Sequence, residues 1–340
     1  MIHAALGQVR GLKGLANAYR RVRSRLLGGG LVLLYHRVTD RPADPFALHV
    51  TPQRFAEQLD VLRRTTTPLG LGEMLALVRA GDLPARAVAV TFDDGYADNL
   101  HQAAPALERY GVPATVFVAT GPLDGVRSFW WDELDRLVLS PARLPPALQL
   151  AAGGGTLRWG TGGREATARD RRRLLRLLHR RLRPATDEER RNVLEQLVRW
   201  AGAAPPPSGA EDRPLTAQEV ARLDSSPLVR VGSHSVSHGV LGKIPPERQA
   251  AELRDSKRRL EEILGRPVDG FSYPYGLPGD YTARTVALTR EAGYAYACTA
   301  LADLLRAGGD PYRIPRVWAR DEEGDAFARR LAAWLPAKPR

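Results

Sequence analysis

Two adjacent carboxylates follow an apolar run in the sequence AVAVTFDDGYADN, residues 87–99. Residues 87–92 have the composition of a buried strand, and Asp93, Asp94 and Gly95 come directly after it. Neighbouring like charges repel, and burying either one costs free energy unless a cation or hydrogen bonds compensate. Asp-Gly pairs are also common in turns. The pattern therefore leaves a turn open beside a metal site, in which one carboxylate binds the cation and the other transfers protons.

A pair of histidines follows a second apolar run. In VGSHSVSHG, residues 231–239, His234 and His238 are four residues apart, which on a helical turn places two imidazoles on one side. Polar groups that follow parallel strands gather on one face of a barrel, so this pair is expected near the two aspartates. Two histidines and one carboxylate are a typical catalytic zinc set that leaves a position open for water. Together the two clusters favour the metal site.

The elements that must position these residues alternate along the chain. Strands are expected at 31–38, 87–92, 113–120, 229–235, 269–276 and 294–300, with helices at 50–64, 99–111, 215–223, 245–265 and 283–294. Thr51 precedes Pro52 as a helix N-cap, and Thr216 with Glu219 forms a capping box. The alternation predicts a parallel α/β fold, and motifs at the strand ends favour a barrel over an open sheet.

Residues 126–213 break this alternation. They contain loop-like stretches rich in glycine and proline, and a helix at 187–200 that Thr186 and Glu189 cap. We expect a mainly helical insertion in one barrel loop. The remaining organisation is predicted as a basic amphipathic segment at 1–30, the barrel at 31–325 and a C-terminal tail at 326–340.

The motifs TFDDG, HSVSH and SYPYG, in this order and each at a strand end, resemble those of the polysaccharide deacetylases of the NodB-homology group. The likeness extends from residues 31–38 to residues 313–320. This resemblance implies an α/β fold of the distorted (β/α)7 barrel type. It also implies metal-dependent hydrolysis of an N-acyl group, usually acetyl, from an amino sugar.

The resemblance also implies roles for individual residues. Asp94, His234 and His238 correspond to the metal ligands, and Asp93 corresponds to the general base. The backbone N–H of Tyr275 corresponds to the donor that stabilises the tetrahedral oxyanion. Zn²⁺ is the expected metal, and Co²⁺, Ni²⁺ or Mn²⁺ accept similar ligands.

Two departures from the family pattern concern proton transfer. Tyr273 stands where the family has an arginine that orients the base, and Arg316, in RIPRVW, is the candidate replacement, with a surface ion pair as the alternative. No histidine occurs after His238, so the family's late histidine acid is missing. His36, after the first strand, is the candidate acid or substrate contact, with a structural histidine as the alternative. This pattern resembles the subgroup that acts in exopolysaccharide or cell-surface glycan production.

Aromatic residues near the motifs are candidate sugar contacts, because aromatic faces stack well on sugar rings. Tyr96 follows the first motif, Trp131 lies in FWWDEL, and Tyr273 opens the YPYG run. The alternative for the tryptophans is that they anchor the insertion to the barrel.

The net charge of +12 is concentrated in two segments. Residues 1–30 hold six Lys or Arg and no acid, and residues 161–183 hold nine arginines against Glu165 and Asp170. Basic amphipathic helices suit an anionic membrane surface or a polyanion, and solvated helices packed on the main domain are the alternative. The lone Cys298 excludes an internal disulfide and a cysteine zinc cluster.

The expected location is cytoplasmic, with peripheral contact at the inner face of the membrane. No apolar stretch approaches the roughly eighteen residues that span a bilayer, and the start lacks the apolar core of a signal peptide.

The expected activity is removal of N-acetyl groups from amino-sugar residues of a polysaccharide or its lipid-linked precursor. Two alternatives keep the site: a deformylase acting on a lipid-linked amino sugar, and a glycan-binding relative without turnover. A nucleic-acid binder is the third alternative that the charge suggests. No nucleic-acid partner is expected, because the chain lacks a recognisable recognition motif.

Overall fold

The computed structural model describes residues 29–335 except 42–43, 125–127, 153–154 and 204–212. Almost all of the basic segment predicted at 1–30 lies outside the described residues. Within the described part of the chain, no helix combines the length and the apolar character needed to cross a bilayer.

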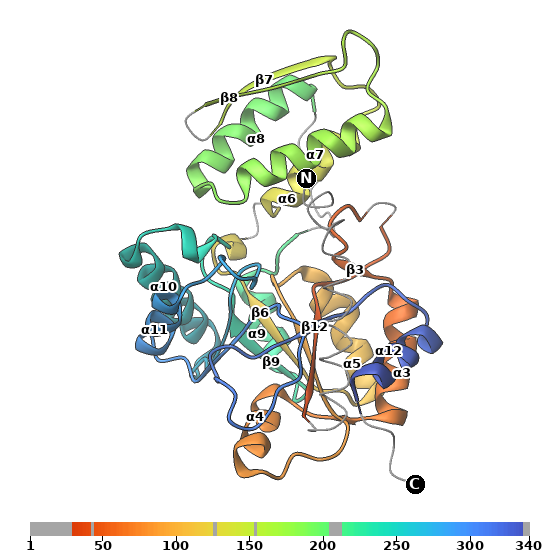
Figure 1. The fold of residues 1–340 in the computed structure, drawn as a ribbon, viewed down its shortest axis with the longest axis vertical. Coiled ribbons are helices and arrows are strands. Elements are labelled where there is room, and N and C mark those ends of the chain that lie inside the picture. Colours follow the sequence, from red (N-terminus) through yellow and green to blue (C-terminus); the bar gives the residue numbers. More distant parts are fainter. Residues whose placement is uncertain (1–28, 42–43, 125–127, 153–154, 204–212, 336–340) are drawn as a thin grey trace.

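A parallel sheet forms the centre of the barrel (Figure 1). Its strands are β1 (Leu31–Tyr35), β4 (Thr67–Pro68), β5 (Ala87–Phe92), β6 (Ala114–Val118), β9 (Val229–Ser233), β10 (Gly270–Ser272), β11 (Tyr296–Cys298) and β12 (Val317–Trp318). They follow the order β11-β10-β9-β6-β5-β1-β12, with β4 paired to β5. The two end strands are linked indirectly, through a bridge between Cys298 and Ile314. The predicted α/β class with a distorted (β/α)7 barrel is confirmed.

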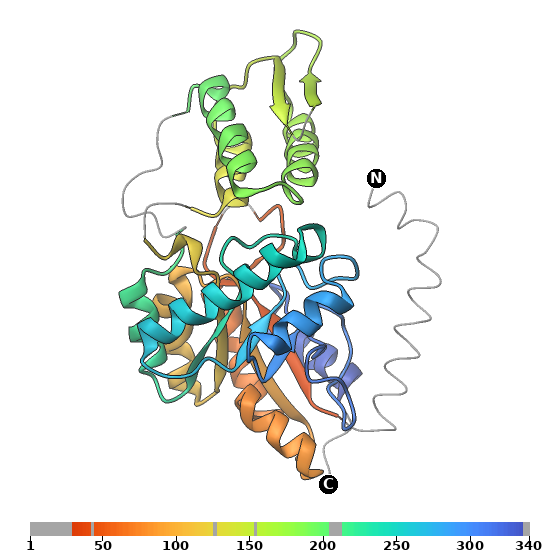
Figure 2. The same cartoon turned by 90° about the vertical axis from the view of Figure 1, so that its left-hand side faces the viewer.

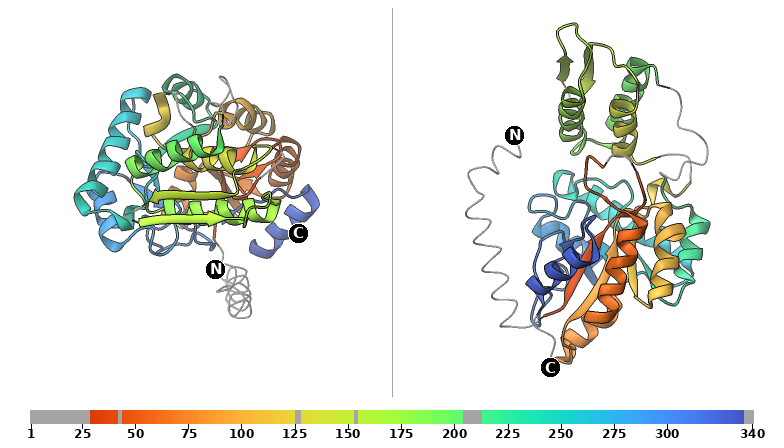
Figure 3. Two further views of the ribbon diagram at one scale, coloured as in Figure 1. Left: turned by 90° about the horizontal axis from the view of Figure 1, so that it is seen from above. Right: turned by 90° about the vertical axis from the view of Figure 1, so that its right-hand side faces the viewer.

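Helices flank the outer side of the sheet (Figures 1 and 3). They are α3 (Pro52–Thr65), α4 (Leu71–Ala80), α5 (Ala104–Tyr110), α9 (Ala217–Asp224), α10 (Pro246–Leu264), α11 (Ala283–Glu291) and α12 (Gly324–Trp334), with short turns η1 (Asn99–Ala103), η2 (Gly121–Asp124) and η3 (Leu241–Lys243). The strands β1, β5 and β6 are buried along their whole length, as parallel strands covered on both faces require. Thr51 is the N-cap of α3, and the capping box of Thr216 with Glu219 is present at α9.

Part of the predicted C-terminal tail is a helix that packs on the barrel. Residues 326–334, expected as part of a tail, lie in α12, which packs against α3. Phe327, Leu331 and Trp334 are buried in the main core. Their spacing of three or four residues forms the apolar stripe that docks this helix. Of the predicted tail, residues 336–340 lie outside the described residues.

Residues 130–203 form a separate unit, here called the cap, that stands over one end of the barrel (Figures 1 and 2). The cap contains α6 (Trp130–Leu139), β7 (Ala147–Ala152), β8 (Gly155–Gly160), α7 (Ala168–Leu182) and α8 (Asp187–Ala201). Its core is separate from the main core and also includes Tyr96 and Ala119 from barrel loops; the cap leucines that contribute to it include Leu134, Leu137, Leu174, Leu178 and Leu197. The predicted capping box of Thr186 with Glu189 begins α8.

The cap includes one feature that the expected helical insertion lacks. Strands β7 and β8 pair as an antiparallel hairpin. Residues in β7 alternate between exposed and buried, so one face of the hairpin covers the helices. A small parallel pair, β2 (Arg37–Val38) with β3 (His49–Val50), lies in the loop after β1.

Candidate active site

A sharp turn after β5 brings the two aspartates to one place. Asp94 and Gly95 both adopt left-handed backbone conformations, with φ of 74° and 84°. A side chain at Gly95 would lie 2.9 Å from the Val118 side chain, so the position requires glycine for space as well as conformation. A left-handed backbone at a residue other than glycine, such as Asp94, costs about 1–3 kcal/mol of folding free energy and persists where the surrounding structure holds it. The turn lets neighbouring carboxylates, which would alternate along a strand, serve one site.

Three potential metal ligands converge at this turn. The Nε2 atom of His238 lies 3.1 Å from Asp94 Oδ1, and that of His234 lies 3.5 Å from the same oxygen. One ligand atom from each residue lies within 4.8 Å of the others, and all three side chains are buried. His234 follows β9, and the loop to His238 is a bend instead of the expected helical turn, with positive φ at Ser235 and His238.

The donor set fits a divalent ion. The Nδ1 atom of His234 lies 2.7 Å from the carbonyl oxygen of Ser272, which accepts its hydrogen. This bond leaves the Nε2 lone pair facing Asp94, an arrangement common for metal-binding histidines. Burial raises the pKa of Asp94, but its interactions with the imidazoles of His234 and His238 outweigh burial and hold the pKa well below its usual range. The carboxylate is therefore ionised and suited to a cation.

Asp93 is held by Arg316 in a two-pronged ion pair. The Nη1 and Nη2 atoms of Arg316 each donate to one carboxylate oxygen at 2.7 Å. Arg316 is only 1% exposed, so the alternative of a surface ion pair is excluded. Burial raises the pKa of Asp93, but the charge of Arg316 outweighs it and the net shift is downward. Asp93 is therefore a carboxylate with a fixed orientation.

Ser272 is a residue that the sequence analysis missed. Its Oγ accepts from Arg316 at 2.8 Å and donates to Asp93 at 3.1 Å, while its carbonyl fixes His234. Ser272 therefore links the Asp93–Arg316 ion pair to His234, one of the three potential metal ligands. The available signal was a polar side chain ending a buried strand, directly before the YPYG run.

His238 lies between two aromatic rings. Its ring centroid is 4.7 Å from that of Trp131 and 4.8 Å from that of Tyr275. Burial lowers the pKa of His238 to about 4, against the opposing effect of Asp94. The imidazole is therefore neutral, as a metal ligand must be.

His36 lies at the end of β1 and stacks on Trp318, with ring centroids 4.6 Å apart. Burial lowers its pKa, and the carboxylates of Asp94 and Asp93 oppose that shift. The Asp93 N–H donates to the carbonyl oxygen of Tyr35 at 3.0 Å, so the backbone of His36 lies beside that of Asp93. Trp318, the partner of this stack, was not singled out from the sequence.

Burial argues against the three predicted sugar contacts. Tyr96 is fully buried and donates to Asp132 while accepting from the indole N–H of Trp131, both at 2.7 Å. Trp131 is 4% exposed and fills the space beside His238, which agrees with its alternative role as an anchor. Tyr273 is 1% exposed and stacks on Tyr281. Stacking on a sugar needs an open ring face, which these rings lack.

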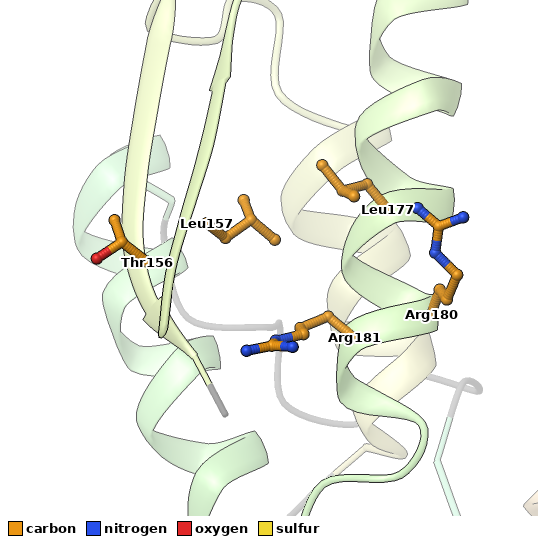
Figure 4. Close-up of a pocket in the computed structure, with 5 residues that line it drawn as sticks. All are labelled: Thr156, Leu157, Leu177, Arg180 and Arg181. Atoms are coloured by element: carbon orange, nitrogen blue, oxygen red, sulfur yellow. The ribbon is translucent and has the colours of Figure 1, made fainter. Parts of the chain in front are cut away.

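A groove in the cap is separate from this site. It has a volume of about 400 Å³ and lies between the hairpin and α7, lined by Thr156, Leu157, Leu177, Arg180 and Arg181 (Figure 4). None of these residues belongs to the loops that carry the aspartates and histidines. The groove is therefore distinct from the cluster of Asp94, His234 and His238.

Comparison with known proteins assigns the class. The sequence pattern of the polysaccharide deacetylase family matches residues 80–143 and 195–297. The chain is 32% identical over 91 residues to the putative polysaccharide deacetylase YxkH of Bacillus subtilis, a match that spans 26% of this chain and 30% of that protein. The chain thus carries a polysaccharide deacetylase domain, as its motifs predicted.

Solved structures show the same fold. The deacetylase PplD of Streptococcus pyogenes, in complex with acetate, is similar with a TM-score of 0.58 and 18% identity, over 88% of this chain and 97% of that one. IcaB of Ammonifex degensii has a TM-score of 0.57 and 21% identity, over 90% of this chain and 97% of that one. The fold is therefore that of the NodB-type deacetylases.

Proposed function

We propose that the protein is a metal-dependent hydrolase that removes N-acetyl groups from amino-sugar residues of a polysaccharide or its lipid-linked precursor. The observation that carries this proposal is the ligand set of Asp94, His234 and His238 beside an aspartate that Arg316 holds ionised. Zn²⁺ is the proposed metal, since two imidazoles and one carboxylate suit it, and Co²⁺, Ni²⁺ and Mn²⁺ are the alternatives.

The proposed reaction divides between the metal and the chain. A divalent ion supplies Lewis-acid activation of water and of the amide carbonyl. Asp93 accepts the proton of the attacking water, and Arg316 keeps its carboxylate oriented and ionised. Among the described residues no acceptor is found for the Tyr275 N–H, which is therefore available to the oxyanion. Such a donor lowers a barrier by about 3–4 kcal/mol.

His36 is the proposed acid that protonates the leaving amine. Its ring is held against Trp318, and it lies close enough to Asp93 and Asp94 for their charges to act on it. The imidazole Nδ1 is buried without a hydrogen-bond partner. Because burial lowers the pKa of His36, its imidazolium is a strong acid: the proposed step is transfer of the Nε2 proton of this imidazolium to the leaving amine, which leaves a neutral ring that solvent reprotonates before the next turnover.

The test is product release from acetylated and formylated amino-sugar oligomers. The proposal predicts acetate from the wild type and none from Asp93→Asn. Formate release exceeding acetate release would favour the deformylase. Glycan binding without either product would favour the non-catalytic relative.

We further propose peripheral contact with an anionic membrane, where lipid-linked precursors lie. The outer side of α7 carries five exposed arginines, for which no ion pair is found within the described residues: Arg169, Arg172, Arg173, Arg176 and Arg180. Its apolar side is buried in the cap core, so only the charged side is available. Each arginine near an anionic surface contributes about 1 kcal/mol.

Vesicle sedimentation tests this contact. Phosphatidylglycerol vesicles should bind the wild type and phosphatidylcholine vesicles should not. The double substitution Arg172→Glu with Arg176→Glu should weaken binding to the anionic vesicles. Equal sedimentation of both proteins would remove the contact from the account.

A further inference from the structure

Two arginines connect the cap to the loops of the candidate active site. We infer that Arg183 and Arg190 are positioning residues for the loops that carry the second histidine ligand and the predicted oxyanion donor. This inference rests on the proposed function. It makes the cap part of the catalytic apparatus, although most of the cap lies outside the ranges that match the deacetylase family.

Arg190 reaches from α8 to the histidine loop. It is 2% exposed, and its guanidinium donates to the carbonyls of Leu182 and Arg183 at the end of α7. A further donation, at 3.2 Å, goes to the carbonyl oxygen of Ser237, the residue before the ligand His238. One buried cation therefore fixes the end of a cap helix and the histidine loop together.

Arg183 contacts the loop that contains Tyr275. Its Nη2 atom donates to Asp280 Oδ1 at 2.5 Å, and its guanidinium carbon lies 4.3 Å from the centre of the Tyr275 ring. Asp280 in turn accepts from the N–H of Leu277 at 3.0 Å. Arg183 thus contacts this loop at two points, by charge and by stacking. A planar guanidinium can make both contacts at once, whereas an ammonium keeps the charge toward Asp280 and loses the stacking.

The loops that these arginines hold have backbones that need support. His238 and Tyr275 adopt φ of 52° and 64°, in the left-handed region that residues other than glycine seldom occupy. Their rings pack against one another at 4.8 Å. The contacts therefore run from Arg183 through Tyr275 to His238. Loss of the guanidinium should loosen both the metal ligand and the predicted oxyanion donor.

A purely structural role is the alternative, in which the arginines only fasten the cap to the barrel. The test compares Arg183→Ala, Arg183→Lys and the control Arg191→Ala in the full chain, Arg191 being an exposed arginine on α8. The readouts are zinc affinity by chelator competition, kcat and KM for acetate release, and the unfolding temperature. Removing a partner that orients a ligand typically costs 10- to 100-fold in metal affinity or activity.

The inference predicts that Arg183→Ala loses about 10-fold or more in zinc affinity and in kcat, with KM little changed. Arg183→Lys should recover part of the loss, and Arg191→Ala should match the wild type. If Arg183→Ala matches Arg191→Ala in zinc affinity and kcat, whatever its unfolding temperature, the inference is overturned. A wild type that releases no acetate while Arg183→Ala still binds zinc more weakly would contradict the proposed function and leave the positioning role supported.

Discussion

The barrel and the cap differ in how they bury apolar side chains and in where they place charged ones. In the barrel, uninterrupted apolar strands such as β1 and β5 are buried on both faces, and charged groups of the site appear where β5 ends. In the cap, amphipathic helices and a hairpin enclose a smaller core and leave arginines outside. The barrel thus carries the reactive groups directly after its strands, and its own Arg316 orients Asp93. The cap carries none of these groups and reaches the site through contacts such as that of Arg190 with the Ser237 carbonyl.

The largest expected effect tests the barrel side of this comparison. Asp93→Asn keeps the size of the side chain and removes the base, so kcat for acetate release should fall by about 10²- to 10⁴-fold. Zinc content should be retained, because Asp93 is not in the ligand set. A variant with more than a third of wild-type kcat would show that another group takes the proton.

The next effect concerns the buried ion pair. Arg316→Met leaves the Asp93 carboxylate buried without its main partner. Breaking a buried pair in this way costs about 3–5 kcal/mol of the free energy of unfolding. Urea unfolding measures it, with Arg313→Met, at a half-exposed arginine near by, as the control. A loss as small as that of the control would mean that water or another cation compensates.

A core substitution in the cap separates the two regions. Leu178→Ala removes a fully buried side chain and should cost the cap about 2–5 kcal/mol. Because the cap has its own core, amide exchange should accelerate in α7 and α8 while β5 and β6 stay protected. Equal acceleration in both regions would show that cap and barrel unfold as one unit.

The smallest expected effect is a pH dependence of the free energy of unfolding that arises from a histidine in the cap. His179 packs against Phe46 and Trp130, and burial, aided by Arg183 and Arg190, lowers its pKa to about 4. The unfolded chain, with a histidine pKa near its ordinary 6.5, therefore binds a proton between about pH 6.5 and 4 that the folded chain does not. Stability should thus fall by about 1–3 kcal/mol as the pH drops through this range.

His179→Phe should make this slope shallower, because the substituted ring does not titrate; the contributions of His238 and His36, whose pKa values burial also lowers, should remain. Unfolding temperatures of the wild type and the variant, measured between pH 7 and pH 4, provide the check. Parallel curves would show that other groups set the acid dependence.

The site motifs were accessible from the sequence because each follows its own strand. Parallel strands gather their carboxyl ends, so Asp94, His234 and His238 were expected together before any coordinates. Ser272 was missed, because its role arises from contacts with Asp93 and Arg316 that lie 179 and 44 residues away. Local patterns do not specify such contacts.

Side-chain exposure and the cap were less predictable. Tyr96, Trp131 and Tyr273 are of a residue type that often contacts sugars, but all three are buried. Whether an aromatic ring is buried depends on the residues that pack over it, which a local sequence pattern does not specify. The hairpin β7–β8 was missed since its alternating pattern is short and rich in alanine and glycine. The helix α12 was expected as a tail for a related reason. Its apolar stripe has only three residues, and the sequence does not show that this stripe packs against α3.

Metal content and acetate release, measured together on the wild type and on His234→Ala, test the central claim most directly. The account predicts stoichiometric zinc or a similar divalent ion in the wild type, acetate from an acetylated amino-sugar oligomer, and loss of both in the variant. A wild type without bound metal, or a His234→Ala protein that binds metal and releases acetate as well as the wild type, would contradict it.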